Sequence, residues 1–225
     1  MMNRPPELLL ASNSPRRREL LALGGWPFGI QASNLDESLL PGEAPGAYVR
    51  RLALEKARAV ESHAQPGQVI LGADTSVVID GEILGKPADS DHARQMLTRL
   101  RGRTHQVFTG VAAVRAGGPA LSTLVITDVP MRPYSDEEIE QYLLTGDALD
   151  KAGAYGIQNP AFQPVAHMAG CYASVMGLPL CHLGVLLREM ALPGQPGLAE
   201  NCQSALNYAC PVWRSITAGT FLHDH

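Results

Sequence analysis

The chain has 225 residues, of which 45% are hydrophobic, and its 18 basic residues are outnumbered by 22 acidic ones. This length fits one domain or two closely joined lobes, and the net charge of −4 excludes the broad basic face of a general nucleic-acid binder. No apolar run reaches membrane-spanning length and residues 1–7 carry no secretory signal, which predicts a cytoplasmic protein.

The first predicted element is a short buried strand at residues 8–11 that leads directly into a helix. Ser14 is placed as the N-cap, Pro15 as the first helical residue, and Arg16 to Arg18 fill the first turn. Because a helix N-terminus favours anions, three arginines there are unfavourable unless an anion binds among them. Backbone N–H groups, hydroxyls and guanidinium groups at one turn indicate a phosphate site. A solvated basic patch is the alternative.

The rest of the chain alternates between helices and strands in a mixed order. Helical spacing and capping residues predict further helices at residues 48–62, 91–99, 136–144 and 180–190. Apolar and β-branched runs predict further strands at residues 69–73, 77–79, 82–84, 105–115 and 121–131. Asp80-Gly81 indicates a tight hairpin turn. Mixed alternation with hairpins predicts an α/β fold with a mixed sheet.

The last quarter of the chain differs from the rest. A Pro/Gly cluster at residues 193–197 predicts a boundary between a main domain, 1–192, and an extension, 193–225. The extension is either mobile or an added packing element. All four cysteines lie in this quarter without a C-x-x-C pair, so they are expected to be free thiols rather than a disulfide framework or a zinc site.

Three further segments carry groups that suggest chemistry. Asp74 is predicted to follow a buried strand, where α/β proteins place ligand-facing groups; a capping aspartate in a turn is the alternative. Lys86, in a Gly-Lys-Pro turn, is either a point charge for phosphate or a solvated lysine. In the run 150–158, Lys151 and Gln158 among small residues predict a loop against a flat ligand, whose edge Gln158 can read. An ordinary helix end followed by a strand would explain that run equally.

Together these segments resemble the Maf family of nucleoside triphosphate pyrophosphatases. The resembling motifs occur in family order at residues 10–17, 36–37, 55–57, 72–75, 84–87, 103–105, 150–155 and 177–179. The resemblance implies a two-lobed, mixed-sheet α/β fold with a deep central cleft, similar to that of inosine triphosphate pyrophosphatases. It also implies hydrolysis of a nucleoside triphosphate to the monophosphate and pyrophosphate with a divalent cation, expected to be Mg²⁺, with Mn²⁺ or Co²⁺ as alternatives.

The run 150–158 is similar to the family branch that acts on dTTP and UTP, which implies these substrates or modified pyrimidine nucleotides. In that branch, the positions matching Arg16, Thr75 and Gln158 are linked to substrate choice. The chain departs from the family pattern in three places. Asn159 replaces a usual glycine, Ser174 replaces a common asparagine, and the extension after residue 192 has no counterpart.

The resemblance and the charges together assign residue roles. Asp74, Glu37 and Lys86 are the predicted catalytic residues, with Asp74 as the presumed proton acceptor for the water that attacks the α-phosphorus. Carboxylates in a basic pocket fit a cation between them and phosphate oxygens, so Asp74 and Glu37 are also the predicted metal ligands. The predicted substrate-binding residues are Ser12, Arg16, Arg17, Lys56, Thr75, Lys151 and Gln158. The scattered histidines, such as His105, are expected in the core or on the surface.

Two other functions stay open at this point. A nucleotide-binding regulator of cell division or septum formation, without turnover, would keep the arginines and Lys86 but could dispense with Asp74. A non-specific phosphohydrolase or sugar-phosphate enzyme would not need the loop that carries Gln158. The expected partner is a small-molecule nucleoside triphosphate, with no nucleic acid and no membrane, and the chain could form a homodimer.

Overall fold

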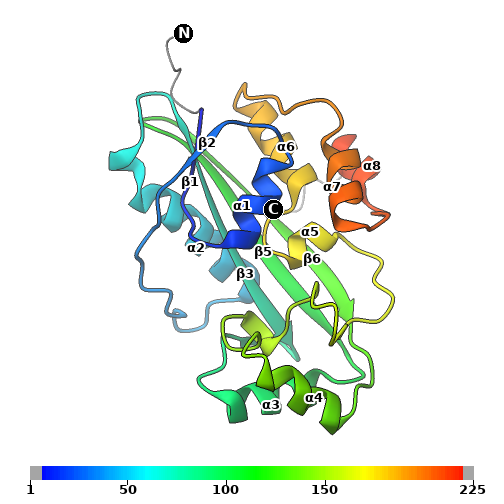
Figure 1. The fold of residues 1–225 in the computed structure, drawn as a ribbon. Helices are drawn as coiled ribbons and strands as arrows, with labels where there is room; N and C mark the ends of the chain where they lie inside the picture. The colour runs from blue at the N-terminus through cyan, green and yellow to red at the C-terminus, as the bar shows by residue number, and fades with distance from the viewer. Residues whose placement is uncertain (1–6, 220–225) are drawn as a thin grey trace.

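The computed structural model describes residues 7–219, which fold around a six-stranded mixed sheet (Figure 1). The strands are β1 (Leu8–Leu10), β2 (Phe28–Ile30), β3 (Val69–Ile79), β4 (Glu82–Leu84), β5 (Thr104–Arg115) and β6 (Ala120–Pro130). Their order is β2-β1-β3-β5-β6, and β4 pairs with the end of β3. β1 pairs in parallel with β2 and β3, whereas β5 pairs in antiparallel fashion with β3 and β6. The predicted α/β class with a mixed sheet is confirmed.

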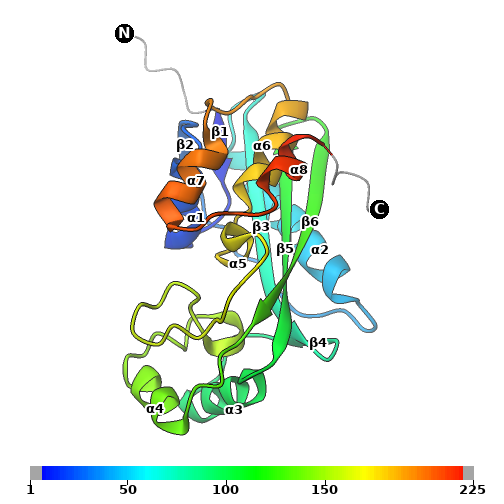
Figure 2. The ribbon, with the colours of Figure 1, turned by 90° about the vertical axis from the view of Figure 1, so that its right-hand side faces the viewer.

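Helices cover both faces of this sheet. They are α1 (Pro15–Ala22), α2 (Pro45–Ala59), α3 (Ser90–Leu100), α4 (Asp136–Leu144), α5 (Tyr172–Val175), α6 (Leu180–Glu189), α7 (Leu198–Leu206) and α8 (Trp213–Thr217), with short 3₁₀ turns at η1 (Glu61–His63) and η2 (Ala152–Ala154). Figure 2 shows α2 on one side of the long strands and α1, α5 and α7 on the other. None of the helices within residues 7–219 is long and apolar enough to cross a membrane.

Two glycines bring α2 into close contact with the sheet. A Cβ atom added at Gly72 of β3 would lie 1.9 Å from the carbonyl oxygen of Ala53. One added at Gly110 of β5 would lie 2.3 Å from the carbonyl oxygen of Val49. Any larger residue at either position would push the helix away. The glycines therefore set how close the side chains of α2 come to those of β3.

The molecule has two lobes joined by the long strands β3, β5 and β6 (Figure 1). One lobe contains α1, α6 and the short parallel strands around a core that includes Leu10, Leu21 and Leu183. The other contains α3, α4 and η2 around a second core that includes Leu97 and Tyr134. The long strands contribute to both cores and so connect the two lobes.

Most predicted elements are confirmed, with ends shifted by a few residues. The cap of α1 is as expected, because the Ser14 side chain accepts a hydrogen bond from the Arg17 amide. The capping box of α4 is also present, with reciprocal bonds between Ser135 and Glu138. The helix expected at 48–62 instead spans Pro45–Ala59, because Pro45 is a suitable first helical residue.

The prediction that a strand stops at Asp74 is wrong. β3 continues without a break from Val69 to Ile79, and Asp74 pairs with Gly110 of β5 while Thr75 pairs with Thr109. The polar residues interrupt the apolar pattern but not the ladder of hydrogen bonds. Asp74 therefore lies in the middle of a central strand rather than in a turn.

The extension is an added packing element as far as residue 219. Its two helices, α7 and α8, pack on α6 through a cluster formed by Cys181, Val185, Ala199 and Ile216. Neither helix was predicted, and the short elements β2 and α5 were also missed.

Candidate active site

A cleft of about 660 Å³ opens between the two lobes. It is lined by all ten residues that the sequence assigned to catalysis or binding, namely Ser12, Arg16, Arg17, Glu37, Lys56, Asp74, Thr75, Lys86, Lys151 and Gln158. They come from the β1–α1 turn, the loop before α2, α2 itself, β3, the end of β4 and the loop around η2. The fold thus brings together segments that are far apart in the sequence. The individual roles of these residues stay predictions.

The β1–α1 turn supplies hydroxyls and arginines to one wall of the cleft. Ser12 is buried, and its Oγ accepts a hydrogen bond of 3.2 Å from the Ser14 amide. The first turn of α1 contains no acidic residue. The positive end of the helix dipole therefore faces the cleft together with the arginine side chains, and nothing acidic in that turn offsets it.

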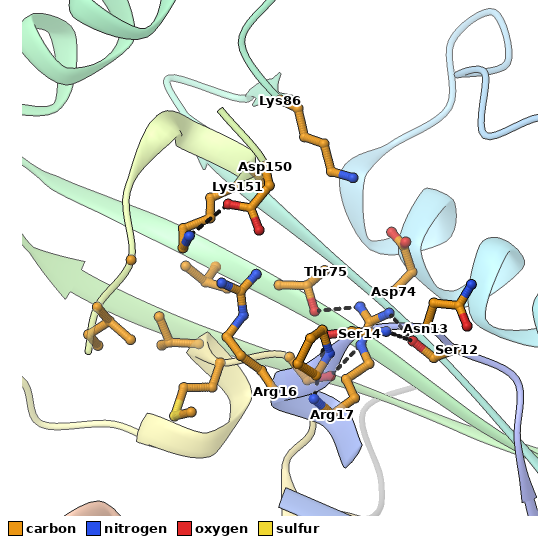
Figure 3. Close-up of a pocket in the computed structure, with 18 of the residues that line it drawn as sticks. Ser12, Asn13, Ser14, Arg16, Arg17, Asp74, Thr75, Lys86, Asp150 and Lys151 are labelled. Atoms are coloured by element: carbon orange, nitrogen blue, oxygen red, sulfur yellow. Dashed lines mark hydrogen bonds and ion pairs between the residues drawn. The ribbon is translucent and has the colours of Figure 1, made fainter. Parts of the chain in front are cut away.

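The two arginines of this turn have different surroundings. Arg17 donates to the Gly177 carbonyl oxygen at 3.0 Å, and to the hydroxyls of Ser12 and Thr75 at 3.4 Å each. Burial lowers the pKa of Arg17, while Asp74 and Glu37 act in the opposite direction; an arginine nevertheless stays charged. Arg16, half-buried, has no hydrogen bond or ion pair within residues 7–219 and extends toward Asp150 and Lys151 (Figure 3).

A buried lysine joins the two predicted catalytic carboxylates. Lys56 Nζ lies 2.6 Å from Asp74 Oδ1 and 2.7 Å from Glu37 Oε1. The side chains of Lys56 and Asp74 are each 9% exposed, whereas that of Glu37 is 53% exposed. Lys56 reaches Asp74 because α2 lies so close to β3. In this arrangement Lys56 holds the carboxylates in place, and its predicted contact with phosphate would require it to reorient.

The carboxylates provide part of a cation site. Asp74 approaches Lys56 through Oδ1 and Glu37 through Oε1, and the other oxygen of each carboxylate has no hydrogen bond within residues 7–219. No group of three or more His, Cys, Asp or Glu side chains in the described part of the chain is arranged to hold a metal ion. Two carboxylates suit a hard cation that takes its remaining oxygen ligands from water and a phosphorylated substrate. The donor set therefore fits a hard divalent cation.

Hydroxyl groups connect the floor of the cleft to the segment behind it. Thr75 Oγ1 lies 3.1 Å from Thr109 Oγ1, which donates to the Ser174 carbonyl oxygen at 2.8 Å. The Ser174 hydroxyl is 2.6 Å from the Cys171 carbonyl oxygen and 2.7 Å from Thr127 Oγ1. Ser174, one of the departures from the family pattern, is thus a buried residue behind the cleft floor.

On the opposite wall, Lys151 is fully engaged by its own loop. Its Nζ lies 2.7 Å from the Asp147 carbonyl oxygen, 2.6 Å from Asp147 Oδ1 and 2.7 Å from Asp150 Oδ1. Asn159 donates to Asp147 Oδ2 at 3.1 Å and accepts from the amides of Ala161 and Phe162. Sequence reasoning missed Asp147, although its position four residues before Lys151 was a usable signal.

Two predicted ligand-facing residues have no partner of their own within residues 7–219. Lys86 is exposed and extends into the cleft on the side of Asp74 (Figure 3). Gln158 is also exposed, next to the Asn159 that fixes the loop. Both side chains can contact a ligand without breaking an existing interaction.

Tyr155 lines the cleft with its ring, but its hydroxyl points into the core. The Tyr155 hydroxyl lies 2.8 Å from His105 Nε2, and the two rings meet edge to face. Burial lowers the pKa of His105 to about 4. His105 is therefore a neutral core residue, as expected.

Comparison with known proteins gives consistent matches over most of the chain. The model of the family described as Maf-like protein matches residues 7–190. A dTTP/UTP pyrophosphatase of Symbiobacterium thermophilum is 50% identical over 187 residues, which cover 83% of this chain and 95% of the relative. A dTTP/UTP pyrophosphatase of Anaeromyxobacter dehalogenans is 48% identical over 191 residues, covering 84% and 96%. Among solved structures, a HAM1 protein from Coxiella burnetii is similar with a TM-score of 0.43 and 13% identity, covering 89% of this chain and 96% of that one.

Proposed function

The chain belongs to the Maf family, and we propose that it hydrolyses dTTP and UTP to the nucleoside monophosphate and pyrophosphate. Relatives named dTTP/UTP pyrophosphatase match it at 48–50% identity over more than four fifths of its length. The observation that carries the proposal is the acidic pair Glu37 and Asp74, held by Lys56 inside a cleft that Arg16, Arg17 and Lys86 also line. A nucleotide-binding regulator without turnover is not favoured, because it would have no use for that pair.

The basic groups of the cleft suit a triphosphate. Arg16 and Lys86 have no competing partner within residues 7–219 and approach the cleft from opposite lobes. We assign them to the outer phosphates, together with Ser12 and the first amides of α1, which donate hydrogen bonds to phosphate oxygens. Arg17 adds positive charge from a fixed position. Held in this way, the outer phosphates leave together as pyrophosphate.

The acidic pair suits proton transfer from water. Asp74 is buried and fixed at one oxygen by Lys56, which leaves its other oxygen to orient a water molecule toward the α-phosphorus and accept its proton. Glu37 and Asp74 would also hold Mg²⁺ against the phosphate oxygens, with Mn²⁺ or Co²⁺ as alternatives. When bound, the cation neutralises charge that develops on the phosphates.

The loop around η2 suits recognition of the base. Gln158 can pair one donor and one acceptor with the edge of uracil or thymine, and Tyr155 and Ala152 line the space beside it. Lys151, Asp147 and Asn159 fix this loop through their mutual bonds. We therefore assign Gln158 to contact with the base and Lys151 to the support of that contact.

Hydrolysis of UTP in ¹⁸O-labelled water tests the reaction. The label is expected in the nucleoside monophosphate, with pyrophosphate as the other product. Label in orthophosphate, with a diphosphate as co-product, would identify a different hydrolase. Asp74→Asn should fold normally and lose roughly 10²–10⁴-fold in turnover, the usual contribution of a general base. Asp128→Asn is the matched control, because Asp128 is an exposed strand carboxylate outside the cleft lining, and it should keep full activity.

A further inference from the structure

All four cysteines of the chain meet at one small apolar cavity away from the cleft. Cys171, Cys181, Cys202 and Cys210 line it together with Trp213 and Ile216, which belong to the α7–α8 extension. All four are free thiols, and only Cys210 is more than marginally exposed. They are separated in the sequence by up to 39 positions (210 − 171). The packing of the extension on the main domain therefore creates this cluster.

Two segments of the cluster lie directly beside each other. The Tyr208 hydroxyl donates to the carbonyl oxygens of Met168 and Gly170, at 3.1 and 2.9 Å. The rings of Tyr208 and Tyr172 are in contact at 5.4 Å between centroids. Residues on both sides of Cys171 are thus bound to the segment that carries Cys210, so the two cysteines line the same cavity from adjacent segments.

The environment of Cys210 favours its thiolate. A hydrogen bond from Cys171 lowers the pKa of Cys210 to about 6, with further hydrogen bonds from the amides of Val212 and Trp213. Burial raises the pKa of Cys181 to about 12 and that of Cys202 to about 11. Because the thiolate is the reactive form, Cys210 is the nucleophile of the cluster and Cys171 is its neighbour.

We propose that Cys210 and Cys171 form a redox modification site, in which a hydroperoxide converts the two thiols into a disulfide that ties the extension to the segment before α5. The Cys210 thiolate attacks the peroxide O–O bond, giving a sulfenic acid and, from hydrogen peroxide, hydroxide. The Cys171 thiol then attacks the sulfenic sulfur, forming the S–S bond and releasing water. In total, two thiols lose two electrons and two protons, and one peroxide is reduced to two waters.

A metal site is the competing use of such a cluster. Four cysteines can hold Zn²⁺ in a tetrahedral site. Within residues 7–219, however, no three cysteine, histidine or acidic side chains are arranged to hold a metal ion. The close pair Cys171–Cys210 with two buried neighbours fits a disulfide better.

Peroxide treatment of the full-length protein followed by peptide mapping tests the site. We expect a linked peptide pair containing Cys171 and Cys210 that disappears on reduction. It should be absent from Cys210→Ser and present in Cys181→Ser, the matched control from the same cavity. Because a cross-link restrains the unfolded chain, the oxidised protein should also have a higher Tm than the reduced one.

Alkylation by iodoacetamide gives an independent measurement that does not depend on the cross-link. In the unoxidised protein Cys210 should react first, with a pH midpoint near 6 that moves toward the ordinary cysteine range in Cys171→Ala. The proposal is overturned if peroxide links a different pair, if Cys210 is oxidised to a sulfinic acid without cross-linking, if the purified protein carries one equivalent of zinc, or if Cys210 titrates as an ordinary thiol.

Discussion

Replacing Lys56 by methionine tests whether the ion pairs of this lysine with Asp74 and Glu37 stabilise the folded protein in the absence of substrate. Methionine keeps an unbranched apolar chain of similar length but removes the ammonium that lies 2.6 Å from Asp74 and 2.7 Å from Glu37. The variant leaves two carboxylates facing one another in the cleft. We expect lower stability, because the charge of Asp74 loses its partner while its side chain stays 9% exposed.

The size of the loss follows from the different exposure of the two carboxylates. Removing one partner of a buried ion pair costs about 3–5 kcal/mol, and this applies to Asp74. Glu37 is 53% exposed, so water can solvate it when the ammonium is removed. The loss of its ion pair therefore costs only about 0–1 kcal/mol of unfolding free energy. Arg17 attracts Asp74 and offsets part of the loss. The expected decrease in unfolding free energy is about 2–4 kcal/mol, which lowers Tm by roughly 5–15 °C in a chain of this size.

Urea titration and thermal unfolding measure this loss of stability. Two further variants test whether it comes from the ion pair. Lys86→Met removes a cleft lysine that has no partner within residues 7–219, so it should leave stability within about 0.5 kcal/mol of the wild type and raise KM for UTP. The double variant Lys56→Met/Asp74→Asn should regain much of the lost stability, because it removes the buried charge as well. If Lys56→Met unfolds like the wild type, or if the double variant regains nothing, the ion pair does not stabilise this site.

Three further variants probe the base loop and the core. Gln158→Ala should bring kcat/KM for CTP closer to that for UTP, because an unpaired polar group costs roughly 1–3 kcal/mol, equivalent to about ten- to a hundred-fold discrimination; unchanged ratios would contradict the assignment. Asn159→Gly removes the hydrogen bond to Asp147, so it should lower unfolding free energy by about 1 kcal/mol and raise KM; an unchanged KM would mean that the loop holds its shape without it. Since the folded pKa of His105 is about 4 against about 6.5 when unfolded, the unfolded state binds more protons between these values. Stability therefore falls as the pH drops through that window, by at most about 3 kcal/mol. In urea titrations at pH 7 and pH 4.5, the unfolding free energy of His105→Gln should decrease less between the two pH values than that of the wild type. An equal decrease in both proteins would show that His105 does not cause it.

Features that depend on neighbouring residues in the sequence could be predicted well. The Ser14 cap, the Ser135 capping box and the turn at Asp80-Gly81 each involve side chains and amides within a few positions. Local geometry alone satisfies these groups, so their residue types carry the signal. Part of the cleft was also predictable by local rules, because arginines in the first turn of a helix indicate an anion there, whereas the complete set of cleft residues came from the ordered family motifs.

The environment of Asp74 could not be predicted in the same way. A carboxylate inside a central strand is unfavourable until a partner reaches it. Here the partner is Lys56, from a helix whose approach depends on Gly72 and Gly110. The ion pair between Lys56 and Asp74 is a tertiary contact, and the residue pattern of a strand cannot predict it. The run Asp74-Thr75-Ser76 therefore resembles a strand end although it is strand interior.

The helices of the extension were missed for a related reason. α7 begins after Gly197 in a left-handed conformation and has no side-chain cap, and α8 has only five residues. Isolated helices of such length are marginal in water. Their stability comes from packing against Cys181 and Val185 of α6. The sequence of residues 193–225 alone does not indicate that this surface is available to them.

The cationic side chains of the cleft are of two kinds: some have partners in the protein and some do not. This difference explains how the cleft can bind a highly anionic ligand while its other residues keep their positions. Arg17, Lys56 and Lys151 already satisfy protein acceptors, so they keep their positions whether or not a ligand is bound. Arg16 and Lys86 have no such partners in the described chain, so both side chains are available to bind phosphates. Binding energy from the unpaired groups is therefore not spent on breaking internal ion pairs, while the paired groups keep the acidic pair and the base loop preorganised. Substitutions of the first kind should then appear in stability, and substitutions of the second kind in KM.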